Sequence, residues 1–169
     1  MFAYVAFVIG AYAGAVVGWE ASPSKQTRFV ESAIRQAVAL RSRQGDLVEG
    51  AIHHSDAGSQ YTAVTFGETR TLSGIRSSVG SVGDACDNAL AETTIGLYKT
   101  ECILSDSPFR RGRLNTVGGV EYITADYVAW FNGQRVMPPR PIPPAEAEAH
   151  FYSQDVIDQP AGSQNPKGA

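Results

Sequence analysis

The first nineteen residues of the chain contain no charged side chain, and this feature most limits how the chain can fold. The stretch MFAYVAFVIGAYAGAVVGW is about as long as a membrane-spanning helix must be, and three of its glycines have the four-residue spacing of packed membrane helices. It is rich in Ala and Gly rather than Leu, however, and no Lys or Arg directly flanks it. β-Branched and aromatic residues at 2–9, turn-forming residues at 10–14 and an apolar run at 15–19 favour a buried β-hairpin instead.

The composition indicates a single folded domain. Of the 169 residues, 43% are hydrophobic and 18% are charged. We expect a core over residues 1–152 and a flexible polar tail over residues 153–169. The net charge of −3 does not by itself indicate a nucleic-acid binder, although basic residues gather between 99 and 113. Two cysteines, Cys86 and Cys102, match neither a zinc knuckle nor a disulfide scaffold, so a reducing cytoplasmic setting is the default.

Several further elements are predicted from periodicity and turn residues. Helical spacing runs from the break at Ser22-Pro23-Ser24 to Gly45. Prolines between 138 and 144 exclude regular structure there. The remaining predictions are a strand at 48–53, a polar turn at 55–59, a helix at 60–72, a strand at 74–79, a loop at 81–88, a helix at 89–103 and a helix at 117–132.

Two carboxylates stand where chemistry could occur. Asp56 follows the end of a predicted strand, and Glu92 lies one turn inside a later predicted helix. Carboxylates that converge repel each other without a cation, and a hard divalent ion such as Mg²⁺ prefers oxygen ligands of this kind. Lys99 follows Glu92 by seven residues, so both lie on one helix face, where a cation suits a phosphate. Taken alone, such an Asp and Glu are more often surface or capping residues.

The segments around these residues resemble a known family. Residues 52–61 (IHHSDAGSQY), residues 81–93 (SVGDACDNALAET) and residues 96–99 (GLYK) closely resemble the integrase core of bacterial insertion-sequence transposases, which are related to retroviral integrases. The similarity runs from about residue 4 to residue 152 and includes residues 127–132 (YVAWFN) and 143–146 (PPAE).

The resemblance implies an α/β fold of the ribonuclease H-like type, a mixed sheet flanked by helices. It implies a site of two Asp and one Glu that binds Mg²⁺ or Mn²⁺, nicks element ends and joins the freed 3′ hydroxyls to double-stranded target DNA. Asp56 matches the second Asp, Glu92 the Glu, and Lys99 the basic residue that faces DNA. Asp87 and Asn88 match the loop before the catalytic helix and would support the site. Arg110 and Arg111 would add DNA contacts.

The sequence departs from the family at the first catalytic Asp. In the family this residue lies on a central strand in a segment that would precede Met1, and no acid in the hairpin replaces it. We therefore expect an N-terminally truncated core with two unpaired inner strand edges, which invite pairing with another chain. Such a chain would be inactive alone and would act as a homo-oligomer or with a complementing transposase chain, in the bacterial cytoplasm near the nucleoid.

Two other readings stay open. The chain could be a non-catalytic DNA-binding or assembly remnant, in which Asp56 and Glu92 persist by descent. A metal-dependent hydrolase could instead use His54 and Asp56, which share a strand face, although the three histidines form no H-E-x-x-H pattern.

Overall fold

The apolar N-terminal segment forms a β-hairpin, as its sequence predicted. The computed structural model describes residues 2–45, 50–55, 74–79, 85–136 and 141–158. Strand β1 (Tyr4–Ile9) pairs antiparallel with β2 (Val16–Ser22), and the register shifts between Val8 and Ile9. Within the described residues, no helix is long and apolar enough to cross a membrane.

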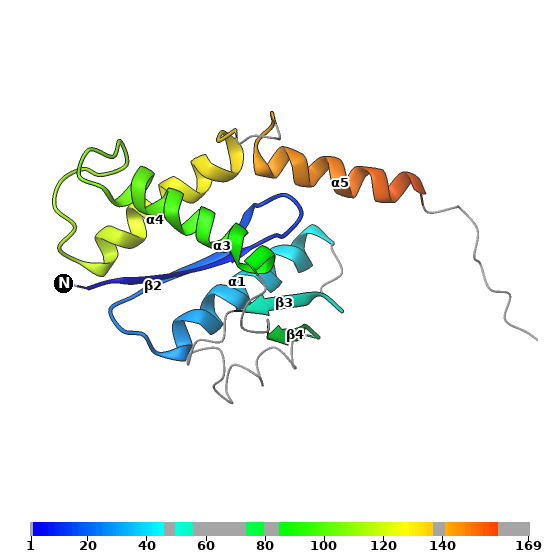
Figure 1. The fold of residues 1–169 in the computed structure, drawn as a ribbon, viewed down its shortest axis with the longest axis horizontal. Helices are drawn as coiled ribbons and strands as arrows, with labels where there is room; N and C mark the ends of the chain where they lie inside the picture. Colours follow the sequence, from blue (N-terminus) through cyan, green and yellow to red (C-terminus); the bar gives the residue numbers. More distant parts are fainter. Residues whose placement is uncertain (1, 46–49, 56–73, 80–84, 137–140, 159–169) are drawn as a thin grey trace, which may run out of the picture.

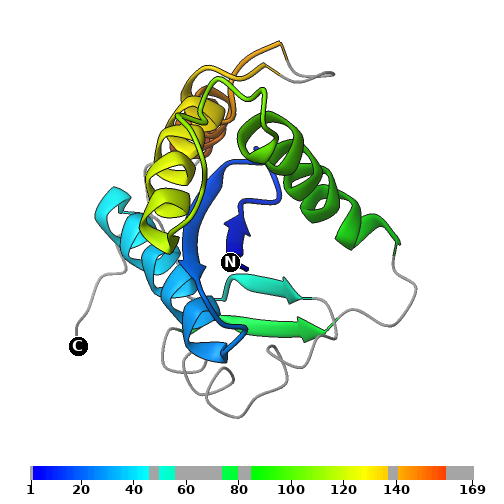
Figure 2. The ribbon, with the colours of Figure 1, turned by 90° about the vertical axis from the view of Figure 1, so that its left-hand side faces the viewer.

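Each face of the hairpin packs against different helices. Ala6 and Val8 point toward α1 (Thr27–Gln44), whereas Val5 and Phe7 pack on the opposite side, as alternation along a strand requires. That opposite side is covered by α3 (Ala85–Tyr98), by the π-helical turn η1 (Lys99–Ile103) and by α4 (Val117–Gly133). Figure 2 shows the hairpin between α1 and the α3 and α4 pair. The hairpin is therefore the centre of a three-layer core.

The strands divide into two small sheets. Strand β3 (Ile52–Ser55) pairs in parallel with β4 (Arg76–Val79), and β1 pairs only with β2 among the described residues. The predicted strand at 48–53 is thus placed too early, because pairing with β4 extends the strand through His54 and Ser55. Among the described strands, each small sheet therefore has unpaired outer edges.

The predicted helices that fall within the described residues are correct in type but not at every boundary. The helix α1 ends at Gly45, whose φ of 82° lets its N–H reach the carbonyl oxygens of Arg41 and Ser42. The helix α3 begins at Ala85, four residues before the predicted start at 89, so the predicted loop at 85–88 is wrong. The predicted helix at 60–72 lies outside the described residues.

The sequence reading missed α5 (Pro144–Asp158). Pro144 is its first residue, where the missing N–H of proline costs nothing, so irregular structure ends one residue earlier than expected. The helix packs on the hairpin turn through Ala147, and Glu148 forms an ion pair with Arg41 of α1. It runs past the expected core boundary at residue 152 (Figure 1).

The side chain of Asn132 continues the hydrogen bonding of β2 at its outer edge. Its Oδ1 accepts from the N–H of Val16 at 2.9 Å, and its Nδ2 donates to the carbonyl of Val16 at 2.8 Å. One amide from α4 therefore satisfies both backbone groups of a residue that is only 3% exposed.

We expect Asn132→Ala to lower the free energy of unfolding by roughly 1 to 2 kcal/mol, because both Val16 groups lose their partner. Urea denaturation monitored by circular dichroism measures this loss. The exposed Gln134→Ala on the same segment is the control and should change stability by less than about 0.5 kcal/mol. Equal stability of the two variants would contradict a structural role for the Asn132 amide.

Candidate active site

The helix α3 has a buried face and an exposed face. Thr94 and Tyr98 are buried, 1% and 5% exposed, and Thr94 donates to the carbonyl of Leu90 at 2.9 Å. Glu92 lies on the exposed side, as does Lys99 at the first position of η1. Glu92 is about two turns from the start of α3 rather than the predicted one, since the helix begins at Ala85.

The other predicted carboxylate cannot be placed. Asp56 follows the last residue of β3 but lies outside the described residues, so its separation from Glu92 remains a prediction. The carboxyl end of β3 lies on the side of the molecule where α3 begins, in Figure 1 as in Figure 2. Asp87 and Asn88 belong to the first turn of α3, not to a loop before it as predicted.

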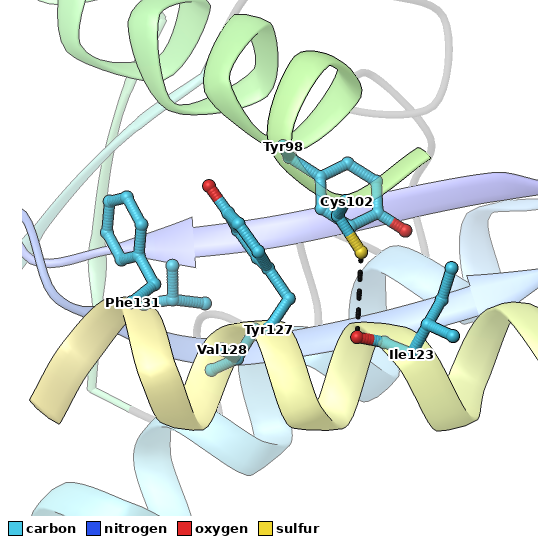
Figure 3. Close-up of a cluster of buried hydrophobic side chains, with 7 residues drawn as sticks. Tyr98, Cys102, Ile123, Tyr127, Val128 and Phe131 are labelled. Carbon is cyan, nitrogen blue, oxygen red and sulfur yellow. Dashed lines mark hydrogen bonds between the residues drawn. The ribbon is translucent and has the colours of Figure 1, made fainter. Parts of the chain in front are cut away.

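Buried aromatic side chains fix the inward face of α3. The Tyr98 hydroxyl shares a 2.7 Å hydrogen bond with the hydroxyl of Thr124, and its ring packs edge-on against Phe7 with centroids 5.0 Å apart. Figure 3 shows Tyr98 and Cys102 facing Ile123, Tyr127 and Phe131 of α4. Burial raises the pKa of Tyr98 to about 12. This packing holds the exposed face of α3 in one orientation.

Cys102 is a core residue and not a candidate ligand. It is fully buried, and its thiol donates to the carbonyl of Ile123 at 3.5 Å. Burial raises the pKa of Cys102 to about 12, so the thiol stays protonated, whereas a nucleophile or metal ligand must be a thiolate. Among the described residues, no group of three or more His, Cys, Asp or Glu side chains is arranged to bind a metal ion.

An ion pair anchors η1 to the segment directly after α4, and no local sequence pattern predicted it. Glu101 accepts from Nε of Arg135 at 2.9 Å and from the hydroxyl of the buried Tyr127 at 2.9 Å. The hydrogen bond from Arg135 holds the pKa of Glu101 below its usual range. Glu101 and Arg135 are 34 residues apart, so only the tertiary fold brings them together. The pair fixes the turn that presents Lys99.

The predicted DNA-contacting arginines differ in their surroundings. Arg110 braces its own loop, because its guanidinium donates to the carbonyls of Gly112 and Ile103 at 3.0 and 3.1 Å. Arg111 and Arg113 are exposed and form no hydrogen bond or ion pair with any described residue. Arg111 is thus better suited than Arg110 to bind an external anion.

The structure also locates one acid of the hairpin, Glu20, and the two histidines that precede Asp56. Glu20 lies within β2, and its carboxylate accepts from Ser32 at 2.6 Å and Gln36 at 3.1 Å. His53 and His54 belong to β3. The pairing of His54 with Asp56 falls outside the described residues.

Comparison with known proteins identifies the family. A model of the integrase core domain matches residues 1–85. The chain belongs to the integrase core family. The structures of two retroviral integrase cores share its ribonuclease H-like fold. That of bovine immunodeficiency virus (BIV) has a TM-score of 0.63 and 17% identity, and the match covers 90% of this chain and 89% of that one. That of HTLV-2 in complex with magnesium has a TM-score of 0.54 and 19% identity, and the match covers 82% of this chain and 80% of that one.

The most similar relatives of this integrase core include transposases. A putative transposase for insertion sequence element IS986/IS6110 of Mycobacterium tuberculosis is 46% identical over 155 residues, which cover 90% of this chain and 54% of the relative. The transposase for IS629 of Shigella sonnei is 40% identical over 90% of this chain and 48% of its own length. The chain therefore spans about half the length of these relatives.

Proposed function

We propose that this integrase core takes part in the DNA integration of an insertion sequence, by metal-dependent 3′ end processing and strand transfer. The observation that carries the proposal is the exposure of Glu92 in α3 and of Lys99 directly after it, next to a helix face that Thr94 and Tyr98 bury. The 40% to 46% identity to insertion-sequence transposases supports it. The chain would act in the bacterial cytoplasm, on double-stranded DNA at the nucleoid.

The chemistry of the two proposed ligands suits a hard divalent cation. Glu92 offers carboxylate oxygens on an exposed face, and the buried Cys102 thiol offers no competing soft ligand. Asp56 and Glu92 would bind Mg²⁺ or Mn²⁺, which when bound activates the attacking oxygen and stabilises the leaving one. Lys99 would bind a DNA phosphate, with Arg110 and Arg111 beside it, while Asp87 and Asn88 at the start of α3 support the carboxylates.

We further propose that the 169-residue chain does not join strands alone. It contributes two of the three carboxylates of such a site, and each of its small sheets keeps an unpaired edge among the described strands. A complementing transposase chain would supply the third carboxylate, whereas a second copy of this chain would only pair with an open strand edge.

The test is a strand-joining assay with purified chain, Mn²⁺ and labelled ends of the element IS986/IS6110. We expect no product from the chain alone. Product should form after addition of the part of the Mycobacterium tuberculosis relative that this chain does not match. Efficient joining by the chain alone would overturn the requirement for a partner.

Glu92→Gln distinguishes an enzyme from a non-catalytic DNA-binding remnant. In the complemented reaction we expect joining to fall roughly 100-fold or more, since the amide replaces an anionic metal ligand, with DNA binding kept. The matched control is Glu121→Gln, an exposed residue of α4 that should leave joining unchanged. A complemented wild-type chain that binds DNA but never joins it would favour the remnant.

A further inference from the structure

A hollow of about 390 Å³ lies between α4 and the loop that precedes it, apart from the exposed face of α3. Its volume is within the range of small-ligand sites. Aromatic side chains form one part of it, because Phe109 and Trp130 both line it and their ring centroids are 5.5 Å apart. Both rings are only half-buried, so part of their apolar surface is left for a ligand.

Polar groups line the same hollow. Arg111, Asp126 and Gln134 contribute to its wall, and all three are exposed. Arg111 forms no hydrogen bond or ion pair with a described residue, whereas the neighbouring Arg110 is bound to backbone carbonyls. The hollow therefore combines an aromatic surface with the available guanidinium of Arg111. The carboxylate of Asp126 can accept hydrogen bonds from a ligand, and the amide of Gln134 can both donate and accept them.

A nucleotide has this combination of chemical groups. A base ring stacks on aromatic side chains, a phosphate pairs with a guanidinium, and the edge of a base bonds to carboxylate and amide groups. In duplex DNA both faces of each internal base are covered by its neighbours, so away from duplex ends an unpaired nucleotide is needed to offer a ring to Trp130. We propose that this hollow binds one unpaired nucleotide of a DNA strand, an inference that rests on the proposed action on DNA.

The fluorescence of Trp130 reports occupancy directly. The chain has two Trp residues, and Trp19→Phe leaves Trp130 as the only one. The probes are a short single-stranded oligonucleotide, the blunt duplex of the same sequence, and an abasic strand of the same length. We expect the single strand to quench Trp130 and to bind at least about fivefold more tightly than the duplex or the abasic strand. Anisotropy of labelled strands with the unsubstituted chain should give the same ranking.

Two arginines of one loop separate a specific contact from general charge. We expect Arg111→Ala to weaken single-strand binding about five- to tenfold, because it removes the phosphate partner in the hollow. Arg113→Ala removes the same charge from an exposed residue that does not line the hollow, and it should change affinity less than about twofold. Equal losses in the two variants, or equal quenching by the abasic strand, would overturn the proposal.

Nucleotide binding in the hollow and strand joining are measured separately, so the two proposals can fail independently. Strand joining without base-dependent quenching of Trp130 would overturn the nucleotide site and leave the proposed function intact. Base-dependent quenching that Arg111→Ala weakens, in a complemented chain that never joins strands, would support the site and contradict the transposase activity.

Discussion

The Arg135→Ala variant should have a free energy of unfolding roughly 2 kcal/mol below that of the wild-type chain. The substitution leaves the Glu101 carboxylate, whose side chain is only 28% exposed, without its bidentate cation. This ion pair is only partly buried, so the remaining carboxylate stays partly desolvated and loses its charged hydrogen-bond donors. Arg135 also lies over the ring of Phe131, 5.7 Å from its centroid, and this contact is lost too. Urea denaturation at pH 7 measures the change.

The pH dependence of this loss identifies its cause. Arg135 lowers the pKa of Glu101 from its ordinary value near 4.5 in the folded chain. The resulting stability is fully present above the pKa of the unfolded chain and disappears as the pH falls through the lower folded pKa. The difference between wild type and Arg135→Ala should therefore shrink below about pH 4.5.

Arg113→Ala is the matched control, an exposed arginine that should change stability by less than about 0.5 kcal/mol at any pH. A loss in Arg135→Ala that stays constant from pH 7 to pH 3 would assign the effect to packing on Phe131 instead. A loss no larger than that of the control would show that the ion pair does not anchor η1.

Local sequence patterns predicted the elements whose signals are local. The hairpin follows from β-branched residues on both sides of a Gly-rich turn, and α4 follows from helical spacing of Val120, Ile123, Tyr127 and Phe131, all of which are buried. The ends of elements were harder, because the end of β3 depends on its pairing with β4, which no pattern within the strand itself reveals.

The candidate site was predictable only in part, for the same reason. The spacing of Glu92 and Lys99 predicted that both lie on one helix face, and both are exposed, Glu92 within α3 and Lys99 at the first position of η1. The contacts that hold this helix come from far along the chain: Tyr98 meets Thr124, and Glu101 meets Arg135. Periodicity within one segment carries no information about such partners, so the support of the site was missed although its exposed face was predicted.

Gly18 is the position of the hairpin most sensitive to an added side chain, because the backbone of α1 lies directly against it. Gly18 lies on β2 where α1 crosses it, and a Cβ there would stand 2.1 Å from the carbonyl oxygen of Ala33 and 3.0 Å from the backbone N of Ala37. Backbone atoms of a helix cannot turn aside as a flexible side chain would, so α1 would have to move away from the sheet. This movement would open the core formed by Ala6, Val30, Ala33 and Ile34.

We therefore expect Gly18→Ala to lower the free energy of unfolding by about 3 kcal/mol or more, at the upper end of overpacking losses. Thermal and urea unfolding measure it, and Gly96→Ala provides the matched control. Gly96 lies in α3, where an added Cβ would meet nothing within 4 Å, so the same substitution should stabilise the chain by roughly 0.5 to 1 kcal/mol through helix propensity. Opposite signs in the two variants would assign the loss to the contact between β2 and α1. A Gly18→Ala chain as stable as wild type would mean that this contact is looser than described.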